Sequence, residues 1–204
     1  MPTQPKANNP SQGGLWGIMG GSFNPIHLGH LAMSQAVMLS LEADGMLFVP
    51  ARRHPLKNDE ELAANYPDRL AMVELAIANN PRFRLEEAQP DIVFTIDLID
   101  FLRHRYPKAR FFLPLGADIV GEFHKWHKYR DIESNVQVII TARPGFVFKP
   151  RTDGVLKGTD LVNIPQYDIS SSDIRRRIRA RLPIAYMVPE SIEQYIYAKG
   201  LYAR

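Results

Sequence analysis

The chain has 204 residues, a length that suits one large domain because single hydrophobic cores rarely exceed about 250–300 residues. Hydrophobic residues make up 45% of the sequence and charged residues 23%, which excludes a disordered or fibrous chain. Basic residues outnumber acidic ones only by 25 to 22, so no polyanionic partner is required, and the absence of cysteine excludes disulfides, a thiol nucleophile and cysteine-ligated zinc.

The first thirteen residues are rich in proline, asparagine and glutamine. They contain no apolar run of the kind found in secretory signals, so we expect a flexible lead-in over residues 1–13. Residues 14–204 are expected to form a single domain. No apolar stretch approaches the ~18–20 residues that cross a bilayer, so we expect a cytoplasmic protein without a membrane partner.

From residue 15 onward a short apolar run, a loop and a helical stretch follow one another repeatedly. Strands are predicted at 15–21, 46–50, 83–88, 110–118, 136–145 and 161–165. Helices are predicted at 31–41, 68–80, 95–107, 171–182 and 189–200. This alternation predicts an α/β fold, a Rossmann-like doubly wound parallel sheet with helices on both faces and a C-terminal helical extension.

Polar and glycine-rich segments follow directly after four of the predicted strands. They read GGSFNPIHLGH, ARRHPLK, LGAD and ARPG. In a doubly wound sheet, ligands bind beyond the carboxyl ends of the strands, near the point where the strand order reverses. We therefore expect these four segments to contribute to one ligand site.

The segment Gly20 to His30 carries the strongest chemical signal. Two glycines after a strand allow the backbone to approach a ligand and to point N–H groups at phosphate oxygens. His27 and His30 are three residues apart at a predicted helix start, so both rings can face one side, and Gly29 between them keeps that side open. A helix N-terminus also favours negative charge. The segment predicts a cradle for a triphosphate.

Two alternatives exist for these histidines. Each ring taken alone could cap a helix or pack in the core. Paired histidines on one helical face could also bind zinc, although the sequence offers no carboxylate at a recognised spacing for a third ligand.

A second anion-binding signal lies near the end of the chain. Ser170, Ser171 and Ser172 precede a helical run that they can cap, and the N–H groups at its start can donate to phosphate. Arg175, one turn later, can reach the same phosphate with its guanidinium fork. The remaining basic residues of this helix are expected to face solvent: Arg176, Arg177, Arg179 and Arg181.

These two motifs together resemble the HxGH nucleotidyltransferase superfamily. GGSFNPIHLGH is similar to its first signature, GG-T/S-F-D/N-P-x-H-x-G-H, and ISSSDIR (169–175) to its second, I-S-S-T-x-I-R. Within the superfamily, residues 15–202 resemble the bacterial nicotinate-nucleotide adenylyltransferases through the segments HPLK (54–57), TID (95–97), 116–126, RPG (143–145) and VPESIEQYIYAKGLY. The chain departs from the usual pattern at Asn24, where Asp is common, and at Ser172 and Leu98, where Thr is common.

The resemblance implies adenylyl transfer from ATP to nicotinic acid mononucleotide, which yields nicotinic acid adenine dinucleotide and pyrophosphate in NAD biosynthesis. It implies that His27 and His30 are catalytic, and that Mg²⁺ arrives on ATP without a ligand from the protein. The residues that it assigns to ATP and its phosphates are Gly20, Gly21, Ser22, Phe23, Lys57, Gly116, Asp118, Arg143, Ser171 and Arg175.

For the acceptor nucleotide, the resemblance implies that Trp126 stacks on the pyridine ring. An indole face attracts such a cationic ring by about 0.5–2 kcal/mol, although Trp126 could equally belong to the core. The backbone N–H groups of Thr95 and His127 are implied to meet the nicotinate carboxylate. A nicotinamide would place an NH₂ group there, which leaves a buried donor unmatched.

Other functions remain open at this point. One is another transferase of the superfamily, such as one acting on phosphopantetheine, although that family usually lacks the first histidine, which is present here as His27. Another is a non-catalytic nucleotide or nucleic-acid binding module that uses the basic helix 175–181. The small excess of positive charge argues against a nucleic-acid partner. Homo-oligomerisation is left open.

Overall fold

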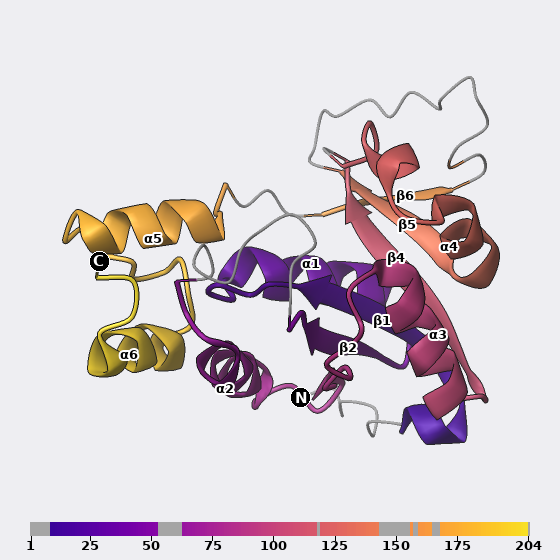
Figure 1. Cartoon of the computed structure of the whole chain (residues 1–204), viewed down its shortest axis with the longest axis horizontal. Helices are drawn as coiled ribbons and strands as arrows, with labels where there is room; N and C mark the ends of the chain where they lie inside the picture. Colours follow the sequence, from indigo (N-terminus) through magenta and orange to yellow (C-terminus); the bar gives the residue numbers. More distant parts are fainter. Residues whose placement is uncertain are drawn as a thin grey trace.

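A single parallel sheet forms the centre of the molecule (Figure 1). The computed structural model describes residues 9–52, 63–117, 119–142, 156, 159–164 and 168–203. Its six strands lie in the order β3-β2-β1-β4-β5-β6, the strand order of a doubly wound Rossmann sheet. They are β1 (Gly14–Gly21), β2 (Gly45–Pro50), β3 (Phe83–Leu85), β4 (Ala109–Gly116), β5 (Gln137–Ala142) and β6 (Asp160–Asn163). The predicted fold class is confirmed.

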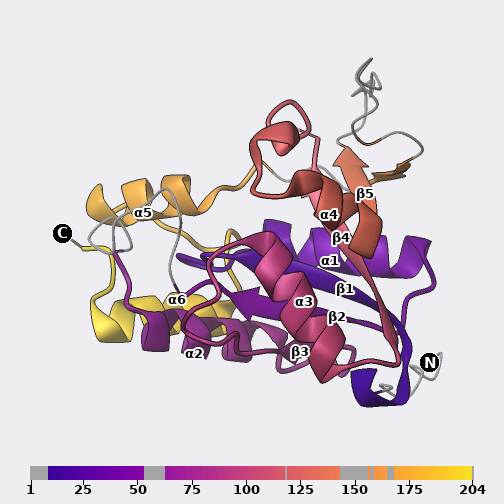
Figure 2. The same ribbon diagram turned by 45° about the vertical axis from the view of Figure 1, so that its right-hand side comes forward.

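Helices cover both faces of this sheet, and each face has its own hydrophobic core. The helices are α1 (Leu28–Ser40), α2 (Tyr66–Ile77), α3 (Thr95–Arg105), α4 (Tyr129–Asn135), α5 (Ser171–Arg179) and α6 (Glu190–Lys199). Apolar side chains of α1, α2, α5 and α6 belong to one core, and those of α3 and α4 belong to the other. Figure 2 shows α3 in front of the sheet and α1 behind it.

The helix α4 was not predicted from the sequence. It has only seven residues, and Ile132 is its one buried residue, so the segment carries too little periodicity to indicate a helix. The 3₁₀ helices η1 (Pro10–Gln12) and η3 (Phe123–Lys125) were not predicted either.

The predicted flexible lead-in ends in a short ordered turn. Asn9 caps η1 by accepting a hydrogen bond from the Ser11 N–H, and Pro10 is buried. The indole N–H of Trp16 donates to the Gly13 carbonyl at 3.0 Å. For residues 1–8, which lie outside the described part of the chain, flexibility stays a prediction.

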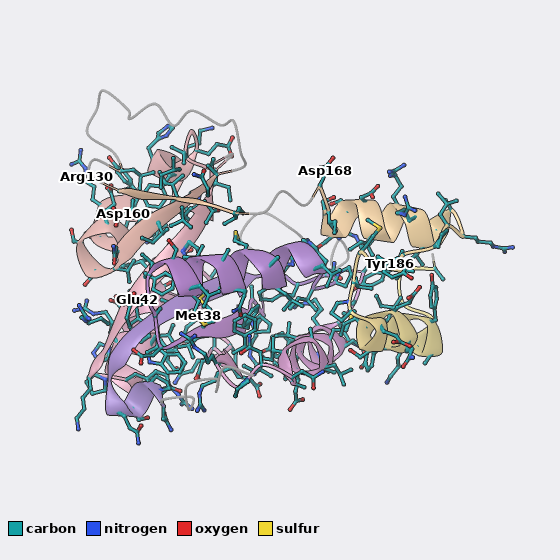
Figure 3. All side chains as sticks on the ribbon, turned by 180° about the vertical axis from the view of Figure 1, so that it is seen from behind. Met38, Glu42, Arg130, Asp160, Asp168 and Tyr186 are labelled. Carbon is teal, nitrogen blue, oxygen red and sulfur yellow. The ribbon has the colours of Figure 1, made fainter. Side chains whose placement is uncertain are left out.

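The C-terminal extension consists of α5 and α6, which lie at one end of the sheet (Figure 1). The Tyr195 hydroxyl of α6 donates to Asp68 of α2 at 2.8 Å. Figure 3 shows Asp168 just before α5, whereas Arg130 and Asp160 lie at the opposite end of the molecule. Among the described helices, none is long and apolar enough to cross a membrane.

The sheet opens between β1 and β4, where the strand order reverses. β1 pairs with β2 from Trp16 to Gly21, at its carboxyl end. With β4, however, it pairs only from Gly14 to Gly17, so within the described residues the carboxyl half of β1 has no ladder on that side. This is the position at which doubly wound sheets bind their ligands.

Candidate active site

The glycines of the first motif form the end of β1 rather than a loop after it. Gly20 and Gly21 pair with Val49 and Pro50 of β2. A Cβ atom at Gly20 would meet no described protein atom closer than 3.8 Å, and one at Gly21 would make only ordinary contact with the Phe23 ring at 3.5 Å. Protein packing therefore does not require glycine at either position, which fits a surface that a ligand approaches closely.

The two histidines stand at the start of α1 with their rings side by side. His27 is the N-cap residue, and the ring centroids of His27 and His30 are 3.7 Å apart with 31° between the planes. The backbone N–H of His27 donates to Nδ1 of His30 at 3.3 Å. Because this bond uses Nδ1 of His30 as the acceptor, the proton of the neutral His30 ring lies on Nε2.

Burial keeps both imidazole rings neutral in the absence of a ligand. It lowers the pKa of His27 from 6.5 to about 4. It also lowers the pKa of His30 well below 6.5, with a smaller contribution from the neighbouring His27. Desolvation disfavours a charged imidazole, whereas a bound polyanion would favour it. At neutral pH the pair therefore offers N–H donors without net charge.

Gly29 makes room for the ring of His27. A Cβ at Gly29 would lie 3.0 Å from Nδ1 and 3.1 Å from Cε1 of that ring. The space that we expected Gly29 to leave for phosphate is thus bordered by an imidazole. Nδ1 of His27 and Oδ1 of Asn24 are buried and have no hydrogen-bond partner among the described residues. Such buried unsatisfied atoms are rare in proteins and fit a site that a polar ligand completes.

The second motif is bonded directly to the first. Ser170 caps α5 by accepting the Asp173 N–H at 3.0 Å. The Ser171 hydroxyl donates to the Pro25 carbonyl at 2.8 Å, and Nη1 of Arg175 donates to the Asn24 carbonyl at 2.7 Å. These bonds join residues 146 and 151 positions apart in sequence. The two motifs therefore meet at one place, as we expected of a single phosphate site.

Arg175 differs from the other arginines of α5. Its side chain is half-buried, and burial lowers the pKa of its guanidinium. Nη2 of Arg175 donates to the Ser172 hydroxyl at 3.3 Å. Arg176 instead forms an exposed ion pair with Asp173, and Arg177 donates to the Pro183 carbonyl. Among these three arginines, Arg175 is the one that turns its charge toward the loop of the first motif.

The N-terminus of α1 is partly satisfied by the protein itself. The Leu28 N–H donates to the Met187 carbonyl at 3.0 Å, and the His30 N–H donates to the His27 carbonyl at 3.0 Å. Within the described chain the Gly29 N–H has no partner. Met187 from the C-terminal extension thus takes one of the donors at this helix start.

On the other side of the sheet opening, the first turn of α3 lies against residues 126–127. The Phe94 ring stacks on the His127 ring with centroids 4.4 Å apart. No side chain caps α3, and the N–H groups of Thr95 and Ile96 have no hydrogen-bond partner among the described residues. The start of α3 thus presents free donors beside His127.

Trp126 lies at the border between core and surface. Its ring centroid is 5.5 Å from that of buried Phe123, and its side chain is half-buried. The core and ligand interpretations of Trp126 are therefore compatible, since one part of the ring packs inward and the rest is accessible.

The remaining candidates are placed as follows. Gly116 ends β4, and its carbonyl accepts the Ile119 N–H at 2.9 Å, which begins a turn. Ser22 and Phe23 follow β1, and Phe23 is buried with a positive φ of 47°. Three predicted residues lie outside the described residues: Lys57, Asp118 and Arg143.

Sequence reasoning missed Arg69, which lies beneath the first motif. Its side chain is 1% exposed, and Nη1 donates to the carbonyls of Ser22 at 2.7 Å and Ala51 at 2.8 Å. A signal existed in the sequence, because Arg69 shares the buried face of α2 with Met72, Val73 and Ile77. A charged residue at a core position of an amphipathic helix is an indication of a special role.

The described donors suit an anion rather than a metal ion. No group of three histidine or acidic residues that could hold a metal is found within the described residues. The gathered groups are imidazoles, a guanidinium, a hydroxyl and helix N–H groups, which bind phosphate oxygens. These residues do not fit a protein-bound Mg²⁺.

Comparison with known proteins identifies the relatives of this chain. The cytidylyltransferase-like family model matches residues 18–177. A probable nicotinate-nucleotide adenylyltransferase of Bacillus pumilus is 35% identical over 91% of this chain and 97% of its own. The nicotinate-nucleotide adenylyltransferase of Bacillus subtilis is 33% identical over the same shares. A probable enzyme of the same name from Roseiflexus castenholzii is 39% identical over 93% of this chain and 98% of its own.

Solved structures agree with the observed architecture. The nicotinic acid mononucleotide adenylyltransferase of Plasmodium falciparum, complexed with NaAD, matches with a TM-score of 0.76 and 23% identity over 92% of this chain and 97% of its own. At this identity the match supports the fold alone. The family model and the sequence relatives show that the chain belongs to the cytidylyltransferase-like family and, within it, to the nicotinate-nucleotide adenylyltransferases.

Proposed function

We propose that this protein transfers the adenylyl group of ATP to nicotinic acid mononucleotide, forming nicotinic acid adenine dinucleotide and pyrophosphate. The observation that carries the proposal is the junction of the two motifs, in which Ser171 and Arg175 bond to the loop that leads into His27. The names of the sequence relatives supply the substrates.

The reaction needs no protein nucleophile and no general base. A phosphate oxygen of the mononucleotide attacks the α-phosphorus of ATP in line, while the bond from that phosphorus to the oxygen bridging to the β-phosphorus breaks. A phosphate monoester has a second pKa near 6, so it is largely dianionic at neutral pH and nucleophilic without help. Catalysis then consists of positioning and of stabilising charge on the transferred and leaving groups.

His27 and His30 supply hydrogen bonds to that developing charge. The His30 Nε2–H is free to donate because Nδ1 accepts the His27 N–H. Both rings are neutral in the free site, and triphosphate binding raises their pKa values toward the charged form. Losing one such donor in other enzymes costs about 10²–10³ in turnover.

The remaining phosphate contacts come from the two motifs together. The N–H groups at the start of α5, Ser171 and Arg175 lie on one side of the loop, and the end of β1 at Gly20 and Gly21 lies on the other. Lys57, Asp118 and Arg143 belong to this proposal by resemblance only. Mg²⁺ is part of the substrate, since it binds the ATP oxygens and neutralises part of their charge.

The acceptor nucleotide binds at the start of α3. In this proposal the Thr95 N–H, which has no partner among the described residues, and the backbone N–H of His127 bind the nicotinate carboxylate, and the accessible part of Trp126 stacks on the pyridine ring. The contact between Phe94 and His127 supports it, because it brings the start of α3 beside residues 126–127. A cytoplasmic location remains a prediction.

The test is to supply ATP and Mg²⁺ with a panel of acceptors and to measure pyrophosphate release. The panel contains nicotinic acid mononucleotide, nicotinamide mononucleotide and phosphopantetheine. We expect turnover with the first, weaker turnover with the second and none with the third. His30→Ala should lower turnover by about 10²–10³ while the protein stays folded, and His27→Ala should behave similarly.

Two results would contradict the proposal. One is preferred release of pyrophosphate with phosphopantetheine. The other is turnover of folded His30→Ala protein within a few-fold of the original, because the imidazole would then play no part in the chemistry.

A further inference from the structure

Arg69 is a buried cation that connects the loops following two neighbouring strands. Nη1 donates to the Ser22 carbonyl beyond β1 at 2.7 Å and to the Ala51 carbonyl beyond β2 at 2.8 Å, and Nη2 lies 3.5 Å from the Arg52 carbonyl. Burying a charge is costly unless hydrogen bonds compensate for lost water. Here the bonds to the carbonyls of Ser22 and Ala51 compensate for burying the Arg69 charge.

The bond to Ser22 determines which way the next N–H group points. The carbonyl of Ser22 and the N–H of Phe23 share one planar peptide unit and point in opposite directions. Because the carbonyl faces Arg69 in α2, the Phe23 N–H faces away from α2. It has no hydrogen-bond partner among the described residues. Phe23 also has φ 47°, a left-handed conformation that a non-glycine residue keeps only when neighbouring bonds hold it.

Arg69 itself does not reach a phosphate through Nη1. That nitrogen carries two hydrogens, and both are donated to the carbonyls of Ser22 and Ala51. Nη1 therefore acts on a ligand through the loop that it holds.

A second guanidinium holds the same loop from another helix. Arg175 of α5 donates to the Asn24 carbonyl, two residues after Ser22. Burial raises the pKa of Tyr202, while the charges of Arg175 and Arg69 act in the opposite direction, so both guanidinium groups lie near this phenol. The loop is thus held by cations from two helices, Arg69 of α2 and Arg175 of α5.

We propose that Arg69 is a positioning residue for ATP, which orients the Ser22–Phe23 peptide so that its N–H meets the triphosphate. This inference rests on the proposed function and adds a residue to it. It separates the two substrates, because the carbonyls that Arg69 holds belong to the loops after β1 and β2, whereas the proposed acceptor site lies at α3.

The test compares Arg69→Met with a matched control, Arg82→Met. Arg82 is a partly buried arginine that, like Arg69, donates to backbone carbonyls, those of Ala43 and Asp44, but it does so at the amino end of β2. Arg69→Met should raise the KM for ATP about tenfold and lower kcat at least tenfold, while the KM for the mononucleotide stays within about twofold. Arg82→Met should change none of these constants.

Three further measurements make the result decisive. Thermal melting shows whether each variant is folded at the assay temperature, and Arg69→Lys replaces Arg69→Met where the latter does not fold. Lysine keeps the charge but is shorter, so it should restore part of kcat. Added guanidinium ion should restore part of the activity of Arg69→Met by occupying the vacated position.

MgATP affinity measured by calorimetry separates this inference from the proposed function. If the original protein transfers adenylate to no acceptor, the proposed function fails, and an about tenfold weaker MgATP affinity of Arg69→Met alone still supports the role of Arg69. Unchanged ATP constants in folded Arg69→Met protein, or an equal change in Arg82→Met, would overturn the inference.

Discussion

At the residue scale, the neutral pair His27 and His30 makes the stability of the protein depend on pH. The folded-state pKa of His27 is about 4, whereas an unfolded histidine titrates near 6.5. Between these values the unfolded chain binds a proton that the folded chain does not, so the free energy of unfolding falls as pH falls. The same sign holds for His30, whose pKa is also lowered.

We therefore expect His27→Asn to flatten this pH dependence. For a shift from 6.5 to about 4, His27 alone removes about 2 kcal/mol of unfolding free energy between pH 7 and pH 5. Urea unfolding measures the unfolding free energy at both pH values. Its decrease from pH 7 to pH 5 should be smaller by that amount in His27→Asn than in the original protein. His104→Asn, an exposed histidine of α3, is the control and should keep the original dependence. Parallel curves for all three proteins would show that His27 is not buried as described.

The sequence allowed some of the site residues to be predicted and not others. The histidine spacing correctly indicated that both rings lie together, because residues three apart share a helix face. It did not indicate the bond from the His27 N–H to Nδ1 of His30, which sets the tautomer. Arg69 was missed because its partners are backbone carbonyls, and no sequence pattern specifies which carbonyls an arginine will meet.

At the scale of elements, the contact between α3 and residues 126–127 shapes the proposed acceptor site. Phe94 precedes α3, is 39% exposed, and stacks on His127. Phe94→Ala removes an aromatic pair that contributes about 0.5–1.5 kcal/mol to holding the two segments together. We expect the KM for nicotinic acid mononucleotide to rise about three- to tenfold, as measured by initial rates at saturating ATP.

The control for Phe94 is an apolar side chain of similar exposure elsewhere. Leu161 of β6 is 42% exposed, and Leu161→Ala should leave both KM values unchanged. A rise in the KM for ATP equal to that for the mononucleotide in Phe94→Ala would show that the stack does not act on the acceptor site alone.

Most elements could be predicted because their hydrophobic patterns are strong. β5 lies within a β-branched run, and β1, β2 and β4 within apolar runs that end in loops. β3 (Phe83–Leu85) is shorter than its predicted range of 83–88, although the Glu86 N–H still donates to the Phe48 carbonyl of β2 at 2.9 Å. No sequence pattern indicated α4, because this helix is short and has one buried residue.

At the scale of the whole molecule, α6 anchors the C-terminal extension to α2 through Tyr195 and Asp68. Tyr195→Phe removes a hydrogen bond of 2.8 Å to a carboxylate. We expect the free energy of unfolding to fall by about 1 kcal/mol, measured by urea titration at pH 7. Tyr197→Phe, on the exposed side of the same helix, should have no effect. Equal stability of the two variants would mean that this bond contributes nothing to docking.

The meeting of the two motifs could be predicted, whereas the way in which they meet could not. A doubly wound sheet brings loops after its strands to one edge, and the resemblance placed both motifs at one ligand. The actual connection depends on side chains and carbonyls in contact, such as the Met187 carbonyl with the Leu28 N–H. Contacts of this kind follow from tertiary packing, which sequence spacing does not encode.

The order in which the chain is synthesised gives these contacts a further consequence. The loop after β1 leaves the ribosome early, but its carbonyls at Asn24 and Pro25 are bonded by Arg175 and Ser171, and its Leu28 N–H is bonded by Met187. A nascent or prematurely terminated chain that lacks the final helices has none of these bonds. In the proposed function, the two halves of the phosphate site are therefore joined only after the final helices have been synthesised.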